Sequence, residues 1–187
     1  MHEQHYLQDA LLQLRKLKSQ AERALAQIAE EDWFRTLDPE GNSIAIIMKH
    51  VAGNMRSRWT DFLTADGEKP DRNRDTEFQV EEGETARSIR ERWETGWRVL
   101  FEALTPLGSE DLLRAVTVRG ERHSVTEAIN RQMTHYAAHV GQIVLLAKHF
   151  AGPNWKSLSI PRGQSHDVDV GKAGEPYSLG ANHTAGR

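Results

Sequence analysis

The sequence predicts an all-α fold: a four-helix bundle over residues 1–150, followed by an irregular C-terminal tail over residues 151–187. Three observations predict it. Apolar residues recur at helical spacing in four stretches, approximately 3–29, 43–64, 84–104 and 124–150. A polar segment, 65–83, separates the second stretch from the third and is too long for a tight turn. The tail is rich in Gly and Pro and shows little periodicity.

The first two helices are predicted from stripes of apolar residues separated by polar ones. The stripe of the first helix is Leu7, Ala10, Leu11, Leu14, Leu17, Ala21, Leu25 and Ile28. Trp33 and Phe34 then follow in a predicted loop. The second helix is expected to begin near Asn42 or Ser43, because either side chain is a good N-cap. Its stripe is Ile44, Ile47, Met48, Val51, Met55, Trp59 and Phe62.

The polar segment 65–83 is predicted to carry the chain across the bundle, so that the third helix begins parallel to the second. Acidic and basic residues are interleaved within 69–75, which indicates a solvated loop rather than a track for phosphates. The third helix has its own stripe, Ile89, Trp93, Trp97, Leu100, Phe101 and Leu104. Thr105-Pro106 ends this helix, because the residue before a proline disfavours helical geometry.

The fourth helix has the clearest start signal in the chain. Residues 116–123, just before it, have strand and turn character. Ser124 and Glu127 then have the spacing of a capping box, in which each side chain satisfies a free backbone amide of the first turn. Gly152-Pro153 ends the helix. In the tail, four residues are predicted to anchor the chain on the bundle or on a partner subunit: Trp155, Leu158, Ile160 and Pro161.

Composition narrows the possible functions. The 187 residues carry a net charge of −3 and include no cysteine. This charge argues against nucleic-acid binding, which normally requires a basic surface. The absence of cysteine excludes disulfides, thiolate metal ligands and a protein thiol nucleophile. No apolar run is long enough to span a bilayer, and no leader segment is recognisable, so we expect a cytoplasmic protein that does not bind membranes.

The histidine pattern carries the functional prediction. His135 and His139 are four residues apart in a predicted helix, so their rings leave the same face. His50 lies in the middle of the second helix. Helical phasing places all three on the flank of their apolar stripes, where two helices meet or border a cleft. Imidazoles that converge from facing helices are typical of metal sites in helical bundles.

A different interpretation remains open at this point, because a histidine within a helix is more often a surface residue or a hydrogen-bonded core residue. Tyr136 occupies the position after His135 at which zinc peptidases carry a catalytic Glu, so the motif supplies no peptidase chemistry. Three polar residues lie near the same helix faces and are either hydrogen-bonding partners of the ligands or ordinary surface residues: Asn54, Gln132 and Gln142.

Residues 42–50, 131–143 and 159–165 resemble an uncharacterised branch of the DinB/YfiT-like superfamily, with similarity over approximately 1–165. The resemblance implies a bundle of up-down-down-up topology with a long crossover between its second and third helices. It also implies that His50, His135 and His139 are the three ligands of a divalent metal ion. Imidazole ligands suit zinc and nickel, and three of them leave positions open for water or substrate.

The function that the resemblance implies is that of a metal-dependent transferase or hydrolase acting on a small molecule. Some relatives transfer low-molecular-weight thiols such as bacillithiol, so a thiol S-transferase is the most specific expectation. No catalytic residue is assigned. The alternative is a non-catalytic metal-binding protein, or a dimeric structural or interaction protein whose tail mediates assembly. A homodimer is expected in either case.

Overall fold

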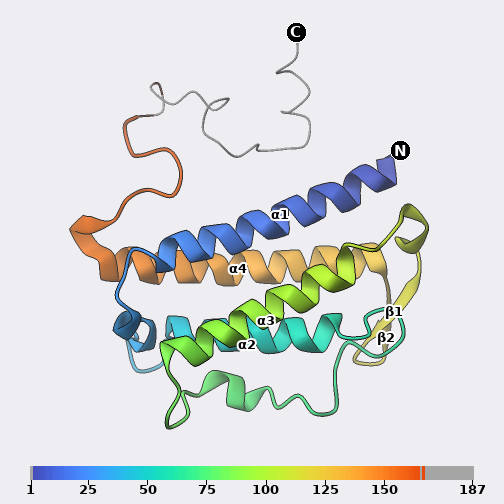
Figure 1. Ribbon diagram of the computed structural model, residues 1–187, viewed down its shortest axis with the longest axis horizontal. Coiled ribbons are helices and arrows are strands. Elements are labelled where there is room, and N and C mark those ends of the chain that lie inside the picture. Colours follow the sequence, from blue (N-terminus) through green and yellow to red (C-terminus); the bar gives the residue numbers. More distant parts are fainter. Residues whose placement is uncertain (1, 165, 167–187) are drawn as a thin grey trace.

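The computed structural model describes residues 2–164 and 166, and this part of the chain is mostly helical. Figure 1 shows four long helices beside a small two-stranded sheet. The α-helices and strands are α1 (His2–Leu25), α2 (Ile44–Trp59), α3 (Ala86–Leu104), β1 (Ala115–Val118), β2 (Glu121–Ser124) and α4 (Val125–Ala151). The single-turn helices are η1 (Glu30–Phe34), η2 (Asp75–Phe78), η3 (Ser109–Asp111) and η4 (Gly152–Asn154).

The helices pack in two close pairs, α1 with α4 and α2 with α3, and α2 also contacts α4 (Figure 1). Four large aromatic side chains of the described residues are less than 2% exposed: Trp33, Trp93, Trp97 and Tyr136. Gly96 allows the close approach of α3 to α2, because a Cβ atom there would lie 3.0 Å from the Cα atom of Ala52.

Within the described residues, none of the helices has the length and apolar character needed to cross a membrane.

Helix boundaries follow local backbone chemistry more closely than the apolar stripes do. The α2 helix ends at Trp59, five residues before its predicted end, because Asp61 adopts a left-handed conformation with φ of 50°. Phe62 is nevertheless buried beyond the helix end, which explains why it continued the stripe. The α1 helix ends at Leu25 rather than at 29, and the predicted loop around Trp33 is the short helix η1.

Hydrogen-bonding side chains mark the starts of three helices. The predicted capping box of α4 is present, with the Ser124 hydroxyl accepting from Glu127 N–H and the Glu127 carboxylate accepting from Ser124 N–H. Ser43 caps α2 by accepting from Ile46 N–H. The α3 helix begins two residues later than predicted, because Thr85 and the serine three residues on form a second capping box.

The predicted strand and turn are the antiparallel hairpin of β1 and β2, in which Val118 pairs with Glu121. The two turn residues both have positive φ, 56° at Arg119 and 78° at Gly120. Asp66, from the crossover, accepts a hydrogen bond from each of their backbone amides at 2.9 Å. The crossover, residues 60–85, is therefore tied to the hairpin.

The first part of the predicted tail packs on the bundle. Trp155 and Leu158 pack against the core, as predicted, whereas Ile160 and Pro161 are exposed. The amide of Gln27 in the turn after α1 exchanges hydrogen bonds with the backbone of residue 156, at 2.7 and 3.0 Å. Residues 165 and 167–187, the rest of the predicted tail, lie outside the described residues.

Candidate metal centre

Three imidazole rings from two helices meet at one point. His50 lies in the middle of α2, and His135 and His139 lie one turn apart on α4. The Nε2 atom of His135 is 3.2 Å from Nε2 of His50 and 3.1 Å from Nε2 of His139. In the described part of the chain, this is the one group of three or more His, Asp or Glu side chains placed to hold a metal ion. The structure thus brings together the three residues that the sequence singled out.

A buried hydrogen-bond chain holds α2 against α4 next to the histidines. The indole N–H of Trp59 donates to the hydroxyl of Tyr136 at 2.9 Å, and that hydroxyl donates to Oδ1 of Asn54 at 3.0 Å. Tyr136 directly follows His135, and Asn54 lies one turn after His50. Because all three side chains are buried, these two hydrogen bonds fix the spacing of the two helices that carry the rings.

The crossover orients the His50 ring from the side that faces away from α4. Its Nδ1 atom is 2.9 Å from Oε2 of Glu77, a buried residue of η2. Arg72 donates to both oxygens of the same carboxylate, at 2.8 and 2.9 Å. Phe78 packs against the His50 ring with the centroids 4.8 Å apart. His50 is therefore enclosed by the crossover on the side away from α4.

The two rings on α4 have different partners. Nδ1 of His139 is 2.9 Å from Oε1 of Gln142, an exposed residue one turn further along the helix. Nδ1 of His135 is buried and has no hydrogen-bond partner among the described residues. A side-chain oxygen therefore sets the tautomer of His50 and of His139, whereas no described side chain sets that of His135.

The electrostatics favour neutral rings at His135 and His139 and an ionised carboxylate at Glu77. Burial, followed by the charges of the other two histidines, lowers the pKa of His135 to about 4. Burial also lowers the pKa of His139, although the hydrogen bond to Gln142 raises it in part. Burial raises the pKa of Glu77, but its hydrogen bonds to His50 and Arg72 outweigh this effect and leave the pKa below its ordinary value. Neutral imidazole is the form that binds a metal ion.

These contacts determine what chemical groups face the centre. An ionised carboxylate only accepts hydrogen bonds, so Nδ1 of His50 carries a proton, and in the neutral form of the ring Nε2 presents a lone pair. The carbonyl oxygen of Gln142 has the same effect on His139. Nε2 of His135 lies within hydrogen-bond distance of both of these atoms, and a cation can accept all three nitrogens at once.

Two of the separations between the nitrogens match those around such a cation. Two imidazole nitrogens bound to one tetrahedral zinc ion lie about 3.3 Å apart. The observed separations of 3.1 and 3.2 Å are close to that value, and the ligand atoms of the group all lie within 4.8 Å of one another. The residues present therefore fit a divalent metal ion held by three imidazoles.

Sequence reasoning located the rings but missed most of their surroundings. Gln142 does contact His139, as one of the alternatives predicted, while Asn54 acts through Tyr136. Gln132 is buried, and its Oε1 atom has no partner among the described residues. Residues 69–75 were predicted as a solvated loop, and this is wrong for Arg72, whose side chain is 5% exposed. The local signal for burial is Phe78, an aromatic residue directly after Glu77 in an otherwise polar segment.

Comparison with known proteins identifies a family but no activity. No curated protein and no solved structure matches the chain. One family model, described as a protein of unknown function, DUF1572, matches residues 2–164. The match covers most of the chain and includes all four helices and the three histidines. The chain therefore belongs to the DUF1572 family.

Proposed function

We propose that this chain is a divalent-metal-dependent protein of the DinB/YfiT-like type, in which His50, His135 and His139 hold one zinc or nickel ion. The observation that carries the proposal is the convergence of three Nε2 atoms from two helices. Two of these atoms have their lone pairs directed at the centre by hydrogen bonds on the opposite side of the ring. Such an arrangement is costly for three neutral rings alone and favourable around a cation.

The proposal includes the up-down-down-up order of the bundle. Contacts between helices support this order. The hydroxyl of Tyr6, near the start of α1, donates to Asn130, near the start of α4, which suits two parallel helices. In Figure 1, α1 and α4 begin at the end that carries the hairpin, and α2 and α3 begin at the other end. The long crossover of residues 60–85 is what parallel α2 and α3 require.

The proposed activity is transfer or hydrolysis on a small molecule, with a low-molecular-weight thiol as the expected substrate. When bound, a divalent ion supplies Lewis acidity that lowers the pKa of a coordinated thiol or water. The chain supplies two rings whose tautomers are set by hydrogen bonds, those of His50 and His139, and a packed wall behind His50. Because the chain contains no cysteine, a reacting thiol has to come from the substrate. Tyr136 in place of a catalytic Glu argues against peptide hydrolysis.

The metal proposal is tested by loading purified protein with zinc or nickel, removing unbound ion and measuring metal content. We expect one equivalent in the wild type and a large loss in His139→Ala. His149→Ala is the matched control, because it removes an exposed histidine of the same helix outside the three-ring group. Wild-type protein without metal, or equal metal content in wild type and His139→Ala, would contradict the proposal.

The catalytic part is tested separately with the loaded protein. A low-molecular-weight thiol and a chromogenic electrophile are supplied, and consumption of the thiol is followed. We expect turnover that depends on metal and is absent from His139→Ala. Loaded protein without turnover on any thiol or hydrolysable ester would favour the alternative, a non-catalytic metal-binding protein.

A further inference from the structure

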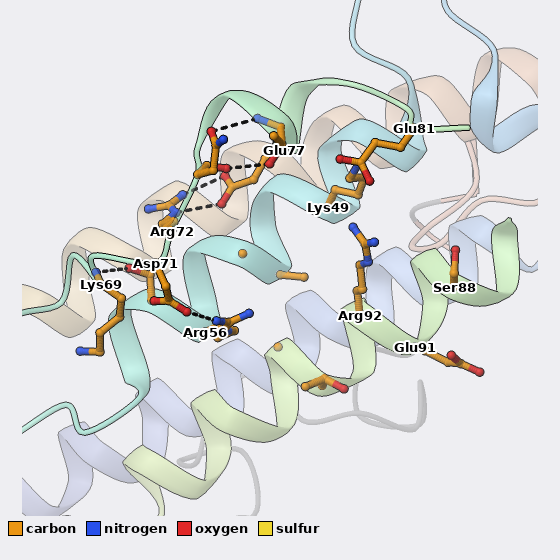
Figure 2. A pocket seen from close by; sticks show the side chains of 17 residues that line it. Lys49, Arg56, Lys69, Asp71, Arg72, Glu77, Glu81, Ser88, Glu91 and Arg92 are labelled. Carbon is orange, nitrogen blue, oxygen red and sulfur yellow. Dashed lines mark hydrogen bonds and ion pairs between the residues drawn. The ribbon is translucent and has the colours of Figure 1, made fainter. Parts of the chain in front are cut away.

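Glu77 has an unusual position for a residue of a polar crossover. Its side chain is only 9% exposed, and its carboxylate makes hydrogen bonds with two side chains. One oxygen contacts Nδ1 of His50, and Arg72 contacts both oxygens. Figure 2 shows the Arg72–Glu77 pair at the edge of a cavity of about 640 Å³ between α2, α3 and the crossover. A carboxylate this well buried needs such partners, because an unpaired one is costly to bury.

The α2 helix leaves space for this carboxylate. Gly53 lies beside Glu77, and a Cβ atom on this glycine would be 2.2 Å from Oε1 of Glu77. That distance is far too short for two non-bonded atoms. The observed position of the Glu77 carboxylate therefore requires glycine at residue 53, in the middle of a helix where glycine is a poor helix former.

Arg72 is itself held by the crossover. Its guanidinium lies 3.5 Å from the carboxylate of Glu68, which also pairs with Arg58 at 3.0 Å and Arg119 at 2.9 Å. The hairpin and α2 are thereby connected to Glu77 through four charged residues: Arg119, Arg58, Glu68 and Arg72. The Glu77 carboxylate is thus held by Arg72 on one side and by the His50 ring on the other.

Among the described residues, Glu77 is the one charged group that contacts any of the three rings through a hydrogen bond. His139 contacts the exposed neutral amide of Gln142, and Nδ1 of His135 has no hydrogen-bond partner within the described part of the chain. A carboxylate hydrogen-bonded to the far nitrogen of a ligating imidazole fixes its tautomer and raises its basicity. The contribution of Glu77 should therefore be larger than that of Gln142.

We propose that Glu77, held by Arg72 and accommodated by Gly53, is a positioning residue for the metal site. Its carboxylate accepts a hydrogen bond from the Nδ1–H group of His50 and thereby directs the Nε2 lone pair of this ring at the shared centre. The inference rests on the proposed function, since it assumes that the three rings bind a metal ion. It goes beyond that function by assigning a role to the crossover, which supplies no ligand itself.

The first test compares zinc affinity in wild type and Glu77→Gln by competition with a chromogenic chelator. We expect a loss of about 10–100-fold, the range found when such outer partners of ligands are removed. Glu84→Gln is the matched control. Glu84 is an equally buried carboxylate that pairs with Lys49 and Arg92 and contacts none of the three histidines. Its zinc affinity should equal that of the wild type.

The second test moves Glu77 without removing it. In Gly53→Ala, the new methyl group displaces the carboxylate, and the adjoining cavity has room for the displaced side chain. Alanine is the better helix former, so the fold should persist while zinc affinity falls. Gly141→Ala is the matched control, because a Cβ atom at this glycine of α4 meets nothing within 4 Å. Its affinity should not change.

The visible spectrum of the Co²⁺-loaded protein gives a second readout, because it depends on the number and arrangement of ligands. We expect altered band positions or intensities in Glu77→Gln and Gly53→Ala, and unchanged spectra in both controls. Affinities and spectra of these two variants equal to wild type would overturn the role of Glu77 and leave the three-histidine proposal intact. Wild-type protein that binds neither zinc nor Co²⁺ would overturn both proposals.

Discussion

The Tyr136 hydroxyl offers a quantitative test of how α2 and α4 are held together. Tyr136 is fully buried, accepts a hydrogen bond from Trp59 Nε1 and donates one to Asn54 Oδ1. Replacing Tyr136 by Phe keeps the ring in the core and removes only the oxygen. Because water does not reach the site, the indole N–H and the amide oxygen are both left without partners.

The loss in the free energy of unfolding depends on the two groups left without a partner, the indole N–H of Trp59 and the amide oxygen of Asn54. A buried polar group that loses its hydrogen bond destabilises a protein by about 1–3 kcal/mol. Trp59 and Asn54 are 2% and 6% exposed, so solvent compensates little. The easier burial of a Phe ring returns a small part of the loss. We therefore expect Tyr136→Phe to lower the free energy of unfolding by about 3 kcal/mol.

Urea unfolding of metal-free protein, followed by far-UV circular dichroism, measures this loss. With a slope of about 2 kcal/mol per molar urea, the midpoint should fall by about 1.5 M. Tyr6→Phe is the control, because the Tyr6 hydroxyl bonds to Asn130 in an exposed setting where water replaces it. That variant should lose less than about 1 kcal/mol. Equal losses in the two variants would refute the reasoning.

Further predictions concern three other contacts. Gln142→Ala should weaken zinc binding by less than about fivefold in a chelator competition, because water can replace an exposed amide; a loss as large as that of His139→Ala would contradict this. Burial raises the pKa of Glu84, but its ion pairs outweigh this and hold it below 4.5. The folded state then binds fewer protons than the unfolded state, so the stability advantage of wild type over Glu84→Gln should persist above about pH 4.5 and disappear as the pH falls through the folded-state pKa. Gly120→Ala should lower the melting temperature by about 2–6 °C, because φ is 78° there; an unchanged melting temperature would argue against the turn.

The helices were predictable because their signals are local. A period of 3.6 residues in the apolar positions is visible within one segment, and the capping box at Ser124 occupies four consecutive residues. The errors occurred where a single backbone angle decides the outcome. The apolar stripe continues to Phe62, but the left-handed conformation of Asp61 ends α2 before it. Periodicity records burial, and burial continues past the end of a helix.

In the candidate site, too, the local features were predictable from the sequence and the contacts between helices were not. The pairing of His135 with His139 follows from helical spacing, and helical phasing placed His50 on a compatible flank. Whether α2 actually faces α4 at that height depends on tertiary contacts, which one sequence does not record. The structure settles that question by bringing Nε2 of His50 within 3.2 Å of His135.

The crossover could not be predicted from the sequence for a physical reason. A stretch of alternating charges has the same composition whether water or opposite charges surround it. Arg72 and Glu77 are buried because each neutralises the other and because Glu77 also meets His50, 27 residues earlier in the chain. The free energy of burying each of these residues depends on whether its partners are buried with it, so no single residue carries a sequence signal for burial. This interdependence leads us to expect that displacing one member, as Gly53→Ala does, will be felt at the histidines rather than only in the crossover.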